Sequence, residues 1–240
     1  MTSFDYTGKE NLDAMALAVR YNDTIYRWLR RGLQTDGSIL EFGAGKGEFC
    51  NRFAKRRDVD HPTTSDTGEQ SPRIQAVELD AAMHSEIICP AVCNIEDVDG
   101  RFDLIYAVNV LEHIKDDVAT VRDFHRRLNP GGRVKIFVPA RRELFSNMDV
   151  LVGHERRYHP AGLRELFREN GFRVLDCRYF DCLGYFATLL YKWTGGAGEV
   201  SPASIRIYDS LIFPLSRLAD ILTGGRIIGK NLVFEAVRVD

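Results

Sequence analysis

The chain has 240 residues, of which 45% are hydrophobic and 28% charged, and its formal net charge is −2 at pH 7. This length and apolar fraction predict one large domain with a sizeable core. The small net charge argues against a general nucleic-acid-binding protein, and five cysteines without a Cys-x-x-Cys pair indicate buried free thiols in a reducing cytoplasm. The first residues lack the basic start and apolar run of a signal peptide, and no stretch of about 18 apolar residues could span a membrane. We therefore expect a cytoplasmic protein.

Seven segments are predicted to be β-strands. Residues 102–108 are apolar almost throughout, which is typical of a parallel strand buried on both faces. The predicted strands are 38–42, 73–78, 89–93, 102–108, 133–138, 172–180 and 231–239.

The segments between these strands have apolar residues at helical spacing or end at a helix stop signal such as Gly32 or Gly171. The polar segment 58–72, with two prolines, is predicted to be an exposed insertion, and 195–202 a hinge between the last two helices. The predicted helices are 11–31, 48–57, 81–88, 116–128, 160–170, 180–193 and 205–222.

Strands that alternate with helices predict a parallel α/β sheet with right-handed crossovers. In an open sheet of this kind the ligand binds outside the carboxyl ends of the strands. The motifs described next fall at such ends.

A glycine-alternating turn after the first strand is the most informative feature of the chain. Residues 39–47 read Ile-Leu-Glu-Phe-Gly-Ala-Gly-Lys-Gly, and glycine lets the backbone approach a ligand because it has no side chain and accepts positive φ. A dinucleotide-binding turn would have a third glycine where this chain has Glu48, and a P-loop would have Lys-Ser/Thr after its last glycine. The turn therefore argues against a nicotinamide dehydrogenase and against a P-loop.

Two further blocks follow this turn in the order of a known family. Residues 102–114 read FDLIYAVNVLEHI, and residues 129–134 read NPGGRV. Together with the glycine turn they resemble the class I S-adenosylmethionine (SAM) methyltransferases over roughly residues 36–140. The resemblance implies SAM as the cofactor and a Rossmann-like, seven-stranded, mostly parallel sheet with helices on both faces. Its last strand would be antiparallel, with an N-terminal helix and a C-terminal helical cap beside the sheet.

The resemblance also implies one domain over residues 1–240. Within it, 1–35 would form a helical lid and 36–140 the SAM-binding core. Residues 141–240 would supply the acceptor-side insertion, the cap helices and the final strands.

The expected cofactor contacts lie at strand ends and on the first helix. Glu78 ends the second strand, where a carboxylate can accept hydrogen bonds from a ribose diol; the alternative is a solvated acid. Asn94 stands where the family often has an Asp facing the adenine, and its alternative is a turn asparagine. Tyr21 would lie near the methionine end of SAM, or is an ordinary amphipathic aromatic. The resemblance implies cofactor contacts by Tyr21, Glu41, Gly43, Ala44, Gly45, Gly47, Glu78, Leu79, Asn94, Ile95 and Asn109.

A looser resemblance continues beyond this core. Residues 153–160 read GHERRYHP, similar to a Gly-His-x-Arg-Arg-Tyr segment of a bacterial methyltransferase subgroup. A hydroxyl acceptor needs a base, and histidine is tunable near neutral pH, so we assign this role first to His154 and second to His113. An acidic acceptor would need no base. The expected acceptor-binding residues are Arg157, Tyr158 and Tyr185.

The same resemblance raises the question of a metal. Some relatives that methylate quinone precursors are thought to hold a metal through a Glu-x-x-Glu-His cluster, but here Asn109 replaces the first acid. Glu112 and His113 alone are a poor site for a hard cation, which prefers several oxygens. We therefore expect no metal.

Two functions follow from these observations. The first is a SAM-dependent methyltransferase that acts on oxygen or nitrogen of a sugar, a lipid-linked glycan or a secondary metabolite. The second is a non-catalytic SAM-binding protein with a regulatory or partner role. The apolar segments 180–193 and 205–222 would pack on the sheet, close over the active site or lie against a membrane surface. We expect a monomer or homodimer with a small-molecule acceptor and no nucleic acid as partner.

Overall fold

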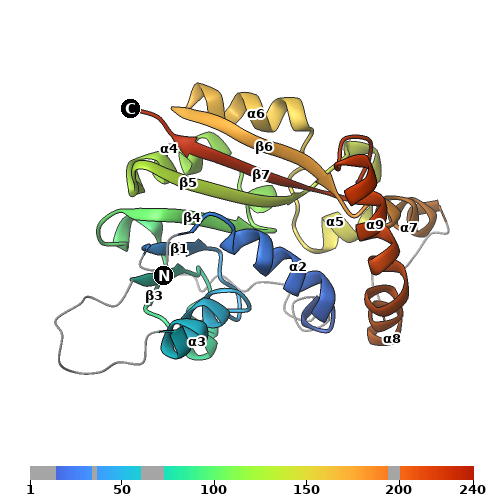
Figure 1. Cartoon of the computed structure of the whole chain (residues 1–240), viewed down its shortest axis with the longest axis horizontal. Helices are drawn as coiled ribbons and strands as arrows, with labels where there is room; N and C mark the ends of the chain where they lie inside the picture. The colour runs from blue at the N-terminus through green and yellow to red at the C-terminus, as the bar shows by residue number, and fades with distance from the viewer. Residues whose placement is uncertain (1–14, 34–36, 61–72, 194–200) are drawn as a thin grey trace.

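A seven-stranded sheet with the order β3-β2-β1-β4-β5-β7-β6 forms the centre of the molecule (Figure 1). The computed structural model describes residues 15–33, 37–60, 73–193 and 201–240. Neighbouring strands from β3 to β5 pair in parallel, whereas β7 runs antiparallel between β5 and β6. This confirms the predicted Rossmann-like sheet and its antiparallel last strand. The strands are β1 (Ile39–Phe42), β2 (Ile74–Val77), β3 (Ala91–Val92), β4 (Phe102–Val108), β5 (Leu128–Pro139), β6 (Phe172–Phe180) and β7 (Asn231–Arg238).

Helices cover both faces of this sheet. The side chains of α4 and α6 join one buried apolar cluster, and those of α2, α3 and α9 join the other. No helix among the described residues is long and apolar enough to cross a membrane. The helices are α2 (Val19–Arg30), α3 (Cys50–Asp60), α4 (Asp117–Arg127), α5 (Asn147–Leu151), α6 (Pro160–Glu169), α7 (Cys182–Trp193), α8 (Pro202–Ile207) and α9 (Phe213–Thr223), with the 3-10 helices η1 (Ala81–Glu86), η2 (Ile95–Asp97), η3 (Leu111–His113) and η4 (Arg142–Leu144) and the π-helix η5 (Tyr208–Ile212).

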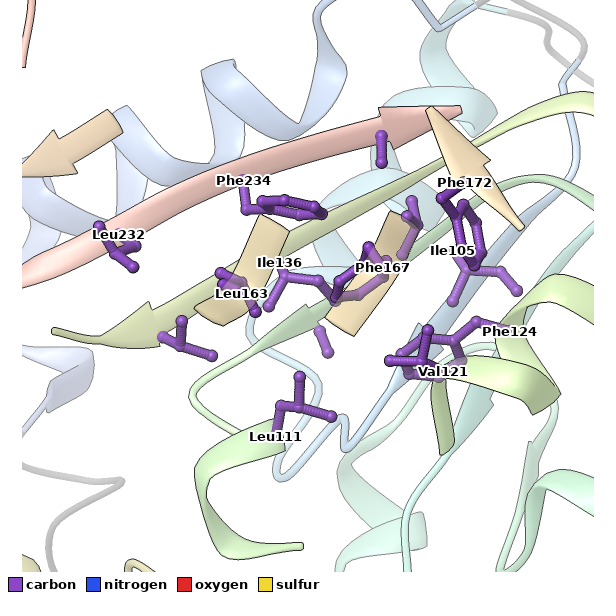
Figure 2. Close-up of a cluster of buried hydrophobic side chains, with 14 of the residues drawn as sticks. Ile105, Leu111, Val121, Phe124, Ile136, Leu163, Phe167, Phe172, Leu232 and Phe234 are labelled. Atoms are coloured by element: carbon purple, nitrogen blue, oxygen red, sulfur yellow. The ribbon is translucent and has the colours of Figure 1, made fainter. Parts of the chain in front are cut away.

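The two clusters use alternate residues of the central strands, because successive side chains of a strand point to opposite faces. Ile105 of β4 lies in the cluster that Figure 2 shows, together with Phe124 of α4 and Phe167 of α6. The next residue, Tyr106, packs on the other face against Phe53 of α3, with ring centroids 5.6 Å apart. The near-continuous apolar run of β4 therefore reflects burial on both faces.

The first predicted helix differs from the structure at its start. Residues 11–14 lie outside the described part, and Ala18 (φ −83°, ψ 66°) interrupts the helix, so that α2 begins at Val19. No side chain of its own caps α2. Instead, the carboxylate of Asp209, far along the chain, accepts hydrogen bonds from the backbone N–H groups of Arg20 (3.0 Å) and Tyr21 (2.9 Å). Burial of a helix end is tolerated because these amides are satisfied.

The predicted helix over 205–222 is present but changes type in its middle. Pro214 has no N–H to donate into the preceding turn, and the backbone widens there into the π-helix η5 between α8 and α9. The sequence contained this signal, because a proline inside a helical pattern marks a local break.

The predicted connections are only partly described. Helix α3 extends to Asp60, past the start predicted for the exposed insertion, and residues 61–72 lie outside the described part. Most of the predicted hinge, 194–200, also lies outside it. Strand β5 begins at Leu128, before the predicted start at residue 133, and its register with β4 shifts between Phe102 and Leu104.

The strand ends that matter for function meet at one edge of the sheet. Asn231, the first residue of β7, pairs with Pro139 at the end of β5 and with Phe180 at the end of β6. Strand β6 therefore runs parallel to β5, and its carboxyl end lies at the same edge as those of β1, β2, β4 and β5. An open α/β sheet binds its ligand at this edge.

Candidate active site

The glycine turn after β1 has the left-handed backbone that its sequence predicts. Gly43 (φ 75°), Gly45 (φ 54°) and Gly47 (φ 80°) all have positive φ. A Cβ atom on Gly43 would lie 2.4 Å from a methyl carbon of Val110, in the loop after β4. The close approach at this glycine is therefore to the protein itself, whereas the sequence suggested a ligand. The contact brings the turn and the loop 109–113 together.

The two acidic residues of this region have different roles. Glu41 is 2% exposed, and its carboxylate accepts the N–H of Cys50 (2.8 Å) near the start of α3. Burial raises the pKa of this carboxyl to about 8. The side chain thus points inward and fixes the turn through Cys50, and its contact with the cofactor stays a prediction.

Glu78, at the end of β2, lies beside the glycine turn. Its carboxylate accepts the N–H of Gly45 (2.6 Å) through one oxygen and the N–H of Asp80 (3.0 Å) through the other. The acid is therefore ordered at the turn, where a ribose-binding carboxylate belongs.

Three predicted cofactor residues follow β2 and β3. The side chain of Leu79 is half exposed, as expected for an apolar contact that a ligand would cover. Ile95 is buried in the core and can offer only its backbone. Asn94 is exposed, and its side-chain amide donates to Asp97 (3.2 Å) at the start of η2. The adenine role and the turn role are both compatible with this position.

The other predicted cofactor residues divide between the edge and the core. Ala44 is buried in the turn, and Asn109 is exposed at the end of β4 with φ 53°. Tyr21 is 5% exposed and packs against the ring of Phe213, with centroids 4.7 Å apart. Its hydroxyl accepts a hydrogen bond from Asn231 (2.5 Å), and burial raises its pKa well above the ordinary value. Tyr21 thus packs in the core beside α9, and its contact with the cofactor stays a prediction.

Three titratable side chains, those of Glu112, His113 and His154, form a cluster that begins two residues beyond Val110. His154 and His113 meet edge to face with ring centroids 4.7 Å apart, and Nε2 of His154 lies 3.8 Å from Oε1 of Glu112. The two predicted base candidates, His154 and His113, therefore lie together. Glu112, which the sequence analysis weighed only as a metal ligand, lies beside them.

Glu112 is fully buried, and neither of its carboxylate oxygens has a hydrogen-bond partner among the described residues. Burial raises its pKa to about 8. His113 is held through Nδ1 by the carbonyl of Gly153 (3.2 Å). Burial and the neighbouring His154 lower the pKa of His113 to about 4, so His113 is a weak base.

Asp149 of α5 orients His154, and the sequence analysis missed it. One carboxylate oxygen lies 2.7 Å from Nδ1 of His154. Burial would raise the pKa of this carboxyl, but hydrogen bonds from His154 and Arg157 outweigh it and hold the pKa at about 2. An ionised carboxylate only accepts, so Nδ1 carries the hydrogen and Nε2 is left as the basic nitrogen. The Ser146-x-x-Asp149 pattern indicated a helix start, not this partner.

Two residues predicted to bind the acceptor are committed inside the protein. Arg157 donates from Nε (2.8 Å) and Nη2 (3.1 Å) to both carboxylate oxygens of Asp149, and its side chain is 7% exposed. The hydroxyl of buried Tyr158 donates to Asp117 (2.8 Å). Arg157 holds Asp149, and Tyr158 anchors its own segment, and contact of either residue with the acceptor stays a prediction. Tyr185, half-buried on α7, stays a predicted acceptor contact.

The expectation of no metal rested on Glu112 and His113 alone. The structure adds His154, and the ligand atoms of the three residues lie within 4.8 Å of one another. One carboxylate and two imidazoles suit zinc better than magnesium, which prefers oxygen ligands. The donor atoms of these three residues are thus of the type that zinc binds, and they are not the set of oxygens that magnesium prefers.

A family model of the methyltransferase domain matches residues 16–176, and the chain therefore belongs to this methyltransferase family. A ubiquinone biosynthesis O-methyltransferase of Pseudomonas aeruginosa (strain UCBPP-PA14) is 30% identical over 99 residues, 40% of this chain and 41% of that protein. The aligned segment thus spans about two fifths of that relative's length.

Two solved structures share the fold. A SAM-dependent methyltransferase from Mesorhizobium loti has a TM-score of 0.57 at 15% identity, over 90% of this chain and 100% of that one. The [4+2]-cyclase SpnF has a TM-score of 0.55 at 16% identity, over 92% and 80%. These identities establish the fold alone, and the cyclase shows that the fold hosts more than one chemistry.

The role of Glu78 can be tested by binding. Glu78→Ala is expected to weaken SAM by about 1.5–3 kcal/mol, the scale of a hydrogen bond to a charged group. Calorimetry with SAM, S-adenosylhomocysteine and NAD measures this, and Glu165→Ala, an exposed acid on α6, is the matched control. Unchanged affinity in folded Glu78→Ala would make this acid a solvated one, and preferential binding of NAD would contradict the cofactor assignment.

The raised pKa of Glu112 predicts a dependence of stability on pH. Between the ordinary carboxyl value of 4.5 and about 8, the native state holds a proton that the unfolded state has lost. Stability from this group is thus present at acid pH and disappears as the pH rises through about 8. Glu112→Gln removes the titration, so its advantage in free energy of unfolding over wild type should grow from pH 5 to pH 9, on the order of a few kcal/mol. A difference in free energy of unfolding between Glu112→Gln and wild type that stays constant from pH 5 to pH 9 would contradict the raised pKa of Glu112.

Metal independence remains a prediction with a sharper test. Because the donor set lacks the oxygens that a hard cation prefers, we expect methyl transfer to be unchanged by chelation and by added magnesium. The same assay with zinc is the decisive arm: activity lost on chelation and restored by zinc would identify the cluster as a metal centre.

Proposed function

We propose that the protein is a SAM-dependent methyltransferase that methylates an oxygen or nitrogen of a small or medium-sized acceptor, with His154 as the base. One observation carries the proposal: Asp149 fixes His154 with Nε2 free, close to the loop that packs on the glycine turn. Cofactor turn and base thus share one edge of the sheet.

Methyl transfer from SAM requires few further groups from the protein. SAM supplies a methyl group already activated by the sulfonium, and transfer is an in-line displacement in which the acceptor's lone pair forms the new bond as the carbon–sulfur bond breaks. The protein holds donor and acceptor together and excludes water. Nε2 of His154 takes the proton of the acceptor, and the carboxylate of Asp149 stabilises the imidazolium that results. Arg157 keeps that carboxylate in place.

Family membership and the O-methyltransferase relative support methyl transfer. A sugar, a lipid-linked glycan and a secondary metabolite remain the candidate acceptors. The alternative is a protein that binds SAM without transferring methyl, in a regulatory or partner role. Incubation with methyl-labelled SAM and candidate acceptors or extracts separates the two, because only the enzyme incorporates label.

The base is tested by replacing the two members of the pair. His154→Ala should lower turnover about 10²- to 10⁴-fold with SAM affinity nearly unchanged. Asp149→Asn should also lower turnover, because an amide can stabilise the wrong tautomer. His159→Ala, an exposed histidine that precedes α6, is the control. If His154→Ala instead lost SAM binding and kept normal turnover at saturation, the segment would belong to the cofactor site.

A further inference from the structure

The helices after β6 present an apolar surface to solvent. Figure 1 shows α7, α8 and α9 together at one end of the molecule, and α7 packs against α9. Four leucines at spacings of four, three and four residues run along η5 and α9, and each is 55–78% exposed. We call them the outer stripe: Leu211, Leu215, Leu218 and Leu222.

The opposite face of this helical run is firmly seated. Ser216 is fully buried, and its hydroxyl donates to Asp181 (2.7 Å). The carboxylate of Asp220 accepts the N–H groups of Asp181 (2.8 Å) and Cys182 (3.1 Å) at the end of β6. Because these bonds fix the rotation of α9 about its axis, the outer stripe is held toward solvent.

Further apolar side chains extend the surface. Ile207 and Ile221 are exposed on the same helical run, and Phe186 and Trp193 are exposed on α7. More than half of the large apolar side chains that are exposed in the described part of the chain lie between residues 186 and 227. Contiguous apolar surface of this kind marks a binding face.

The exposed charges on the described parts of these helices have one sign. The exposed charged residues of the described segments 182–193 and 201–228 are Lys192, Arg206 and Arg226, all of them cations. The only acids of these segments, Asp209 and Asp220, are buried and accept backbone hydrogen bonds. The described segments 182–193 and 201–228 themselves offer an anionic partner no exposed carboxylate, and Glu143 of η4 is a half-exposed acid beside α7.

We propose that the outer stripe and its neighbours dock on the surface of an anionic lipid bilayer. The acyl region of such a bilayer would accept the leucines, and its interface with water is where Trp side chains such as Trp193 are favoured. Its negatively charged headgroups would attract the cations. A second copy of the chain would bring the same cations face to face across a two-fold axis, which costs free energy. The charge pattern therefore favours lipid over self-association.

Vesicle flotation of the full chain tests the proposal directly. The protein should float with vesicles of phosphatidylcholine mixed with phosphatidylglycerol, bind far less to phosphatidylcholine alone, and dissociate as salt rises. The pair Leu215→Gln and Leu218→Gln should lower the partition coefficient about tenfold or more because apolar burial is lost. Arg206→Gln with Arg226→Gln should remove most of the preference for anionic vesicles, since each cation contributes on the order of 1 kcal/mol.

Matched controls and opposing outcomes make the test decisive. Ile88→Gln with Leu175→Gln removes two apolar side chains exposed elsewhere and should leave flotation unchanged. Melting temperatures and SAM binding of every variant report whether the fold is intact. Absence of flotation by the wild type, or equal loss in the control, overturns the proposal. So does a dimer in sedimentation velocity that the Leu215→Gln and Leu218→Gln pair abolishes, because the surface would then belong to a second copy.

Discussion

The packing of Val110 against Gly43 holds the two halves of the site together. Only a residue without Cβ fits at position 43, because such an atom would lie 2.4 Å from the valine methyl and the left-handed backbone disfavours other residues. The contact fixes the glycine turn against the loop after β4, and Glu112 follows Val110 by two residues. The position of Glu112 relative to the glycine turn is thus set by a contact between two segments, each of which follows a central parallel strand.

The pKa values of two buried carboxyl groups near His154 are shifted in opposite directions. Asp149 receives hydrogen bonds from Arg157 and His154, and its pKa falls to about 2. Glu112 has no such donor among the described residues, and its pKa rises to about 8. At neutral pH one group is therefore a fixed negative charge and the other an acid that still holds its proton. This separation gives His154 one anionic neighbour and keeps repulsion between the two carboxyl groups low.

How far the sequence predicted the structure depended on the kind of information each residue carried. Strand β4 was predicted with its observed bounds because burial on both faces leaves a continuous apolar run. The placement of His154 at the sheet edge followed from motif order, and the structure agrees. The side chains of Arg157 and Tyr158 bond to Asp149 and Asp117, which the sequence did not predict, because a motif places a residue near an edge without fixing where its side chain points. Asp149 could not be found, since a buried acid has no sequence pattern of its own.

The capping of α2 by Asp209 has a consequence for the order in which the molecule assembles. The amide of Tyr21 waits for an acceptor 188 positions further along the chain, so the N-terminal helix leaves the ribosome with its first turn unsatisfied. The parallel strands β1, β2, β4 and β5 lie between these two segments in the sequence and pair with one another directly, so their pairing can form beforehand. Completion of the N-terminal cover is therefore a late event, coupled to the arrival of the C-terminal helices.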